Sequence, residues 1–128
     1  MKGVAKRASS RSAVDGVLLL DKPFGLSSNQ ALQQAKRLLN ASKAGHAGTL
    51  DPAATGLLVV CLGEATKLAG MGLEDNKTYE ACIELGSATD SGDAQGQVIA
   101  RRPFLGTDAD IDVALARHRG PLSQVPPM

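Results

Sequence analysis

Short runs of hydrophobic residues alternate with polar stretches along the chain, and these runs predict the elements of the fold. The apolar runs at residues 16–20 and 57–62 are too short for helices and end at Asp or Gly, so each predicts a buried strand. The first does not alternate between polar and apolar positions, which favours a central strand covered on both faces.

A helix is predicted between these two strands. Ser27 lies three residues before Gln30, the spacing of a capping box at a helix N-terminus. The helix is expected to end near Asn40, and the polar, glycine-rich stretch that follows predicts a loop held on the end of a core strand. Its apolar face is formed by Ala31, Leu32, Ala35, Leu38 and Leu39.

The second half of the chain predicts shorter elements. Residues 64–73 suit a helix weakened by two glycines, and residues 78–85 alternate as in an antiparallel strand with one solvated face. Residues 97–101 predict another strand, and Thr107 is expected to cap a last helix. The fold class expected is α+β, with a mixed, mostly antiparallel sheet and flanking helices.

Composition and charge narrow the classes of function. From Met1 to Gly45 the net charge is +6, and the remainder carries −5. A basic front half, including an expected flexible arm at residues 1–15, suits a polyanion such as RNA, although a solvated tail without a partner is the alternative. No apolar run reaches membrane-spanning length, and a cytoplasmic protein is expected. Cys61 and Cys82 are expected in the core, and no zinc site is indicated.

Asp51 is the leading candidate for chemistry. A residue before proline is restricted to extended backbone, so the carboxylate leaves the chain in a narrow range of directions. Glycines at positions 48 and 56 leave room for a ligand. The simpler alternative is that Asp51 caps a turn that begins at Pro52.

Three further residues form a constellation with Asp51 that suits nucleotide chemistry. A carboxylate can act on a sugar or an electron-poor base, and Tyr79 can stack on an extruded base. His46 and Lys22 can hold displaced phosphates. Each has a structural alternative: Tyr79 in a core, His46 as a polar loop residue, and Lys22 at a solvated strand end.

These residues lie in motifs that closely resemble the TruB family of tRNA pseudouridine synthases. The similarity is strongest from Gly45 to Leu58, GHAGTLDPAATGLL, and in GEATK at residues 63–67. Ser91 stands where the family usually has threonine. The remaining matches are GVLLLDKP at residues 16–23, Gly25, Ser27, Ser28, Asn29, Lys77, Tyr79, Gly86, Thr89, Asp90, Asp93 and Gly96.

The resemblance implies an isomerase that converts uridine 55 in the T-loop of tRNA to pseudouridine. Asp51 would attack the uridine, the N1–C1′ bond would break, the base would rotate and a C5–C1′ bond would form. Tyr79 would pack on the flipped base, and His46 would help to displace it. Lys22, Lys67 and Thr49 would lie near the RNA. The resemblance implies no cofactor or metal, a T-arm stem-loop as partner and a monomer when full length.

Members of that family are much longer, so residues 16–128 are expected to be the N-terminal part of an incomplete catalytic domain. The remainder, absent here, carries an arginine that pairs with the catalytic aspartate. Two other hypotheses therefore stay open. The chain is a catalytically inactive tRNA- or RNA-binding module, or it is not independently stable because its sheet has an unpaired edge.

Overall fold

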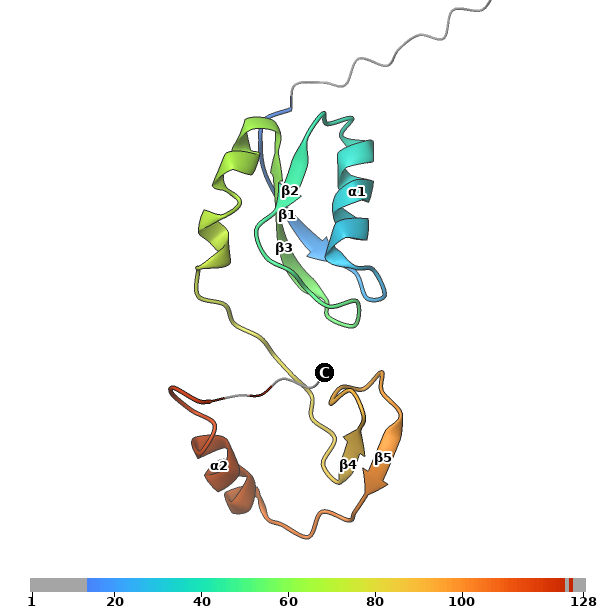
Figure 1. Cartoon of the computed structure of the whole chain (residues 1–128), viewed down its shortest axis with the longest axis vertical. Helices are drawn as coiled ribbons and strands as arrows, with labels where there is room; N and C mark the ends of the chain where they lie inside the picture. Colours follow the sequence, from blue (N-terminus) through green and yellow to red (C-terminus); the bar gives the residue numbers. More distant parts are fainter. Residues whose placement is uncertain (1–13, 124, 126–128) are drawn as a thin grey trace, which may run out of the picture. The chain divides into compact units, whose positions relative to one another are not determined.

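The chain forms two compact units, one that runs to Thr78 and one that begins at Tyr79. In this computed structural model, residues 14–123 and 125 are described (Figure 1). The predicted flexible arm at residues 1–15 therefore lies outside the described residues, apart from its last two positions.

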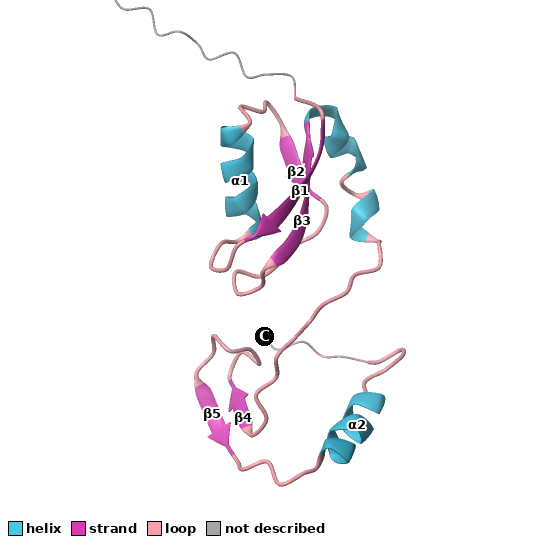
Figure 2. Cartoon of the chain, turned by 180° about the vertical axis from the view of Figure 1, so that it is seen from behind, coloured by secondary structure: helices cyan, strands magenta, loops and turns pink. Residues whose placement is uncertain are grey.

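The first unit is built on a three-stranded sheet. Its elements are β1 (Gly16–Lys22), α1 (Ser28–Leu38), β2 (Ala44–His46) and β3 (Gly56–Leu62). The strand order is β1-β3-β2, and both pairings are antiparallel. Figure 2 shows α1 along one side of this sheet and the short helices that follow β3 on the other side.

Helix α1 and the core beneath it follow the predicted pattern. Ser27 caps the helix, and the capping box with Gln30 is formed. The apolar face of α1 packs against alternate residues of β3, which is the central strand. The buried residues of this core are Ala31, Leu32, Ala41, Leu58, Val60 and Leu62.

Strand β1 departs from the prediction of a central, fully covered strand. It pairs only with β3 and forms one edge of the sheet. Its residues alternate in exposure: Leu18 and Leu20 pack towards the core, whereas Val17 and Leu19 are 56% and 68% exposed. A continuous apolar run cannot distinguish an edge strand from a central one, because it does not report what covers each face.

After β3 the chain forms two 3₁₀ turns, η1 (Gly63–Leu68) and η2 (Met71–Leu73). The prediction of a weak helix over residues 64–73 is thus confirmed, but the helix is of the 3₁₀ type and is divided into two parts. Asp15 Oδ1 accepts a hydrogen bond of 2.6 Å from the Glu64 amide, which satisfies a free N–H at the start of η1.

The second unit contains a short hairpin and a helix. Strands β4 (Ser87–Thr89) and β5 (Val98–Arg101) pair antiparallel, and α2 (Asp108–Ala116) starts from the predicted cap Thr107. Both units are thus helix and antiparallel sheet, which confirms the α+β class.

One carboxylate organises the loop of the hairpin. Asp93 Oδ1 accepts hydrogen bonds from Ser91 Oγ at 2.7 Å and from the amides of Gln95 and Gly96. The Ser91 hydroxyl, and then the two amides, hold the pKa of Asp93 below its ordinary value.

Two predictions for the second unit are wrong. Residues 78–85 form no strand, and all of them are exposed. The alternation of polar and apolar residues indicates which side chains would share a face of a strand. A strand also needs a neighbouring strand to pair with, and the described residues provide none for this segment. Cys82 is consequently exposed rather than part of a core, whereas Cys61 is buried as predicted, and both thiols are free.

Candidate active site

The candidate site is the connection between β2 and β3, residues 47–55, called the Asp51 loop below. Strands β1 and β2 both run antiparallel to β3, so both end towards the side at which the loop enters β3, and the last residue of β2, His46, pairs with Val60 past the middle of that strand. Lys22 pairs directly with Gly56, the first residue of β3. The topology therefore brings Lys22 to the end of the sheet that carries the Asp51 loop, and His46 directly precedes that loop.

The side chain of Asp51 is exposed and has no bonding partner among the described residues. Within the described part of the chain, its carboxylate forms no hydrogen bond or ion pair, and the Ala54 amide bonds to the Asp51 backbone carbonyl at 3.0 Å. A capping aspartate would accept that amide bond with its side chain. The structure thus excludes the simpler alternative that Asp51 serves as a turn cap.

The backbone on each side of Asp51 is tied to the end of β1, the turn that follows it and the start of α1. Leu50 is bonded twice by the Ser28 hydroxyl, which accepts from its amide at 2.8 Å and donates to its carbonyl at 2.9 Å. The Pro52 carbonyl accepts the Gly25 amide at 2.7 Å and the Lys22 ammonium at 3.4 Å. The residues adjacent to Asp51 are therefore anchored while its carboxylate stays exposed.

Lys22 is fully buried, with 0% of its surface exposed. Besides the bond to Pro52, its Nζ donates to the carbonyls of Leu26 at 2.6 Å and Pro23 at 3.0 Å. Three carbonyl oxygens satisfy the three donors of an ammonium group. Lys22 is thus bonded to the Asp51 loop through Pro52, and the alternative of a solvated strand end is excluded. The prediction that Lys22 holds a phosphate does not fit this position, because its ammonium has neither exposed surface nor a free donor.

His46 is half-buried at the end of β2, where its backbone pairs with Val60. Its ring Nδ1 is buried and has no hydrogen-bond partner within residues 14–123. Buried polar atoms are usually paired, so this nitrogen is an exception among the described residues.

The other predicted site residues lie on the surface. Thr49 is exposed in the Asp51 loop. Lys67 lies on η1 and pairs with Glu64 in an exposed i,i+3 ion pair. Tyr79 is 66% exposed and begins the second unit, outside any strand. The first unit by itself thus combines Asp51, Thr49, His46 and Lys22, and Tyr79 belongs to the second unit.

Ser28 and Gly25 are two residues of this site whose roles the sequence did not reveal. Helical periodicity places Ser28 in the first turn of α1, but it gives no sign of a contact 22 residues along the chain. Their inclusion in the family motif is the one signal that marked them.

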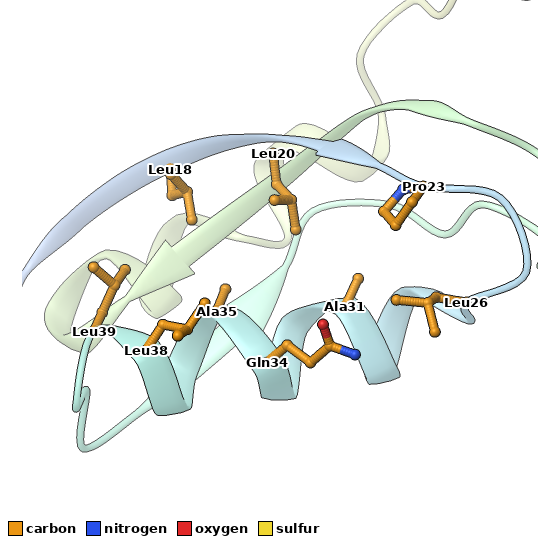
Figure 3. A pocket seen from close by; sticks show the side chains of 9 residues that line it. All are labelled: Leu18, Leu20, Pro23, Leu26, Ala31, Gln34, Ala35, Leu38 and Leu39. Atoms are coloured by element: carbon orange, nitrogen blue, oxygen red, sulfur yellow. The ribbon is translucent and has the colours of Figure 1, made fainter.

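A separate apolar groove of about 250 Å³ lies between β1 and α1. Figure 3 shows Leu18 and Leu20 of β1 facing Ala31 and Ala35 of α1 across it. Gln34 is the polar side chain in its lining, and no titratable group faces it. The groove therefore offers no chemistry of its own.

Neither a metal centre nor a membrane span is found in the described parts of the chain. No three His, Cys, Asp or Glu side chains gather as ligands there. No helix among those residues is long and apolar enough to cross a bilayer.

Residues 36–128 match the model of the TruB family pseudouridylate synthase N-terminal domain. The chain is 59% identical over 128 residues to tRNA pseudouridine synthase B of Aromatoleum aromaticum, which covers 100% of this chain and 42% of that protein. It is 54% identical over 125 residues to the protein of the same name from Chromobacterium violaceum, covering 98% and 41%. The chain thus spans less than half the length of these relatives.

Two solved structures show partial similarity. One is the crystal structure of the archaeal box H/ACA sRNP Nop10-Cbf5 complex, with a TM-score of 0.41 and 50% identity over 42% of this chain and 18% of that one. The other is an H/ACA RNP bound to a substrate RNA containing 2′-deoxyuridine, with a TM-score of 0.43 and 46% identity over 44% and 18%. Both superpositions are partial, and the fold assignment rests on the strands and helices described above.

Proposed function

This chain belongs to the TruB family of pseudouridylate synthases, and from that premise we propose that it supplies the catalytic aspartate of a tRNA pseudouridine synthase. The observation that carries the proposal is the state of Asp51. Its carboxylate is exposed and unbonded, whereas the backbone on both sides of it is anchored. Such a group is oriented and available to attack a substrate.

The proposed substrate is uridine 55 in the T-loop of tRNA. Asp51 attacks the nucleotide and forms a covalent bond to it, the N1–C1′ bond breaks and the base rotates. C5 then bonds to C1′, and the bond to Asp51 breaks again, which regenerates the carboxylate. The proton on C5 leaves, and N1 gains a proton, so the product is an isomer of the substrate. The step involves no net oxidation or reduction, and it requires no redox cofactor.

The remaining site residues serve RNA binding in this proposal. Tyr79 packs on the flipped base, because base–aromatic stacking compensates for lost base stacking. His46 helps to displace the base, in line with its position directly before the Asp51 loop. Lys67 and Thr49 are exposed and contact the RNA backbone, whereas the buried Lys22 acts through the loop.

A second candidate function is RNA binding without turnover. The net charge of +6 from Met1 to Gly45 favours it, because positive charge attracts the phosphates of RNA whatever the base sequence. We also propose that residues 16–128 are the N-terminal part of a catalytic domain, and that the full-length protein is a cytoplasmic monomer. Both proposals are compatible with either function.

The test uses a T-arm hairpin tritiated at C5 of uridine 55 alone, incubated with the complete gene product. Release of the label into water is expected, because C5 exchanges its hydrogen for a bond to C1′. A matched hairpin labelled at a stem uridine should release none. Binding of the hairpin without release from position 55 would favour the second function, and equal release from both hairpins would reject the T-loop target.

A further inference from the structure

Ser28 is a buried polar residue that the proposed chemistry does not use directly. It is 2% exposed and forms the first residue of α1. Its hydroxyl donates a hydrogen bond to the Leu50 carbonyl at 2.9 Å and accepts one from the Leu50 amide at 2.8 Å. Neither bond belongs to the helix, whose N-terminal cap is the neighbouring Ser27.

The two bonds fix the backbone position of Leu50, the residue directly before Asp51. On the far side, the Pro52 carbonyl is held by Gly25 and Lys22. On the near side, Ser28 holds the residue that directly precedes Asp51. Without it, one of the two anchors of Asp51 is lost while the other remains.

We propose that Ser28 is a positioning residue for Asp51, which acts by fixing the Leu50 backbone on the N-terminal turn of α1. This inference rests on the proposed function. Ser28 touches neither substrate nor the reacting atoms. Its effect arises because a displacement of about 1 Å in a reacting group can cost on the order of 100-fold in rate.

The adjacent serine provides a matched control. Ser27 Oγ accepts the Gln30 amide at 3.2 Å and caps α1, whereas the hydrogen bonds to Leu50 come from Ser28. Ser27→Ala and Ser28→Ala remove the same hydroxyl group from consecutive positions of the same helix. A role limited to helix stability predicts similar effects from both, whereas positioning predicts a loss of rate from Ser28→Ala alone.

The experiment measures label release from the C5-tritiated T-arm hairpin in single turnover at saturating RNA, with the complete gene product. Ser28→Ala is expected to slow release by roughly 10- to 100-fold with RNA affinity unchanged. Ser27→Ala is expected to retain the wild-type rate at temperatures where it is folded. Equal rates in the two variants, or a wild-type rate in Ser28→Ala, would overturn the inference.

Two additions keep the test decisive. Ser28→Cys keeps the shape of the side chain with a slightly larger and more weakly hydrogen-bonding atom, so it replaces the alanine variant if that variant fails to fold. It should then still slow label release relative to the wild type. Hydrogen exchange of the Leu50 amide should accelerate in both Ser28 variants and stay slow in Ser27→Ala, whether or not the protein turns over RNA. Slow exchange in the Ser28 variants would refute the anchor itself, whereas anchoring without label release by the wild type would refute the proposed function.

Discussion

The Lys22 ammonium lies 3.4 Å from the carbonyl oxygen of Pro52, a residue 30 positions further along the chain. This contact joins the end of β1 to the loop that carries Asp51. It also uses the last free N–H donor of the Lys22 ammonium, because the other two donors bond to the carbonyls of Leu26 and Pro23. Lys22 therefore differs in role from the exposed Lys67, although both are lysines of the same motif set.

Substitution of these two lysines should separate their roles. Lys22→Met leaves three carbonyl oxygens without their donor and should lower the free energy of unfolding by about 1–3 kcal/mol. It should leave the salt dependence of RNA binding unchanged. Lys67→Met should do the reverse: the slope of log affinity against log salt should fall by about 0.7–0.9 for one lost phosphate contact.

Denaturant unfolding and filter binding at several salt concentrations, both on the complete gene product, measure these quantities. A reduced salt slope in Lys22→Met would contradict the buried role of its ammonium. An unchanged slope in Lys67→Met would remove Lys67 from the RNA interface.

Tyr79 is proposed to stack on the flipped base through its ring rather than its hydroxyl. Tyr79→Phe should therefore retain most activity, whereas Tyr79→Ala should lose about 1–3 kcal/mol of stacking. Phe104→Ala is a matched control, because Phe104 is another exposed aromatic residue of the second unit. Steady-state kcat/KM on the T-arm hairpin measures the effect, and an equal loss in the alanine variants at both positions would argue against stacking by Tyr79.

The hairpin loop of the second unit has its own pH dependence. Because hydrogen bonds lower the pKa of folded Asp93, its ionised form stabilises the loop above the ordinary carboxyl range. That contribution is lost as pH falls through the folded pKa. Ser91→Ala should raise the pKa of Asp93, since the Ser91 hydroxyl is its largest cause.

Carboxyl carbon chemical shifts measured by NMR across an acid titration test this relationship. Asp110 is an internal control, because Thr107 lowers its pKa through separate hydrogen bonds. A shift of Asp110 together with Asp93 in Ser91→Ala would point to loosening of the whole unit instead of a local bond.

The 128-residue chain by itself is expected to be marginally stable. Strands β1 and β2 are both sheet edges, and Val17, Leu19 and Leu57 are exposed apolar residues of the first unit. Unpaired edges favour association with other chains. Sedimentation combined with denaturant unfolding should show self-association or a non-cooperative transition, and a cooperative transition in a monomer would disprove this expectation.

Local sequence signals predicted those elements that depend on neighbouring residues. The capping box at Ser27 and the helix cap at Thr107 located the two described α-helices, because a cap is determined within four residues. The apolar run of β3 was equally clear. Strand β2 was not predicted, because three residues are too few to show an alternation of polar and apolar positions. They form a strand only because they pair with β3.

Relations between distant segments could not be predicted in this way. The alternation at residues 78–85 suggested a strand for which the described residues supply no partner. The burial of Lys22 and the bond from Ser28 to Leu50 depend on how the Asp51 loop meets the turn before α1. Asp51 itself was recognised from its proline and its motif, but the anchors on its two sides required the structure.

The most direct test of the account is single-turnover label release by Asp51→Asn. The carboxylate forms no hydrogen bond within the described residues, so this substitution should leave the unfolding midpoint and the affinity for the T-arm hairpin unchanged. With C5-tritiated uridine 55 in that hairpin, the account predicts that the wild-type gene product releases the label and that Asp51→Asn releases none. Release by Asp51→Asn at the wild-type rate would contradict it.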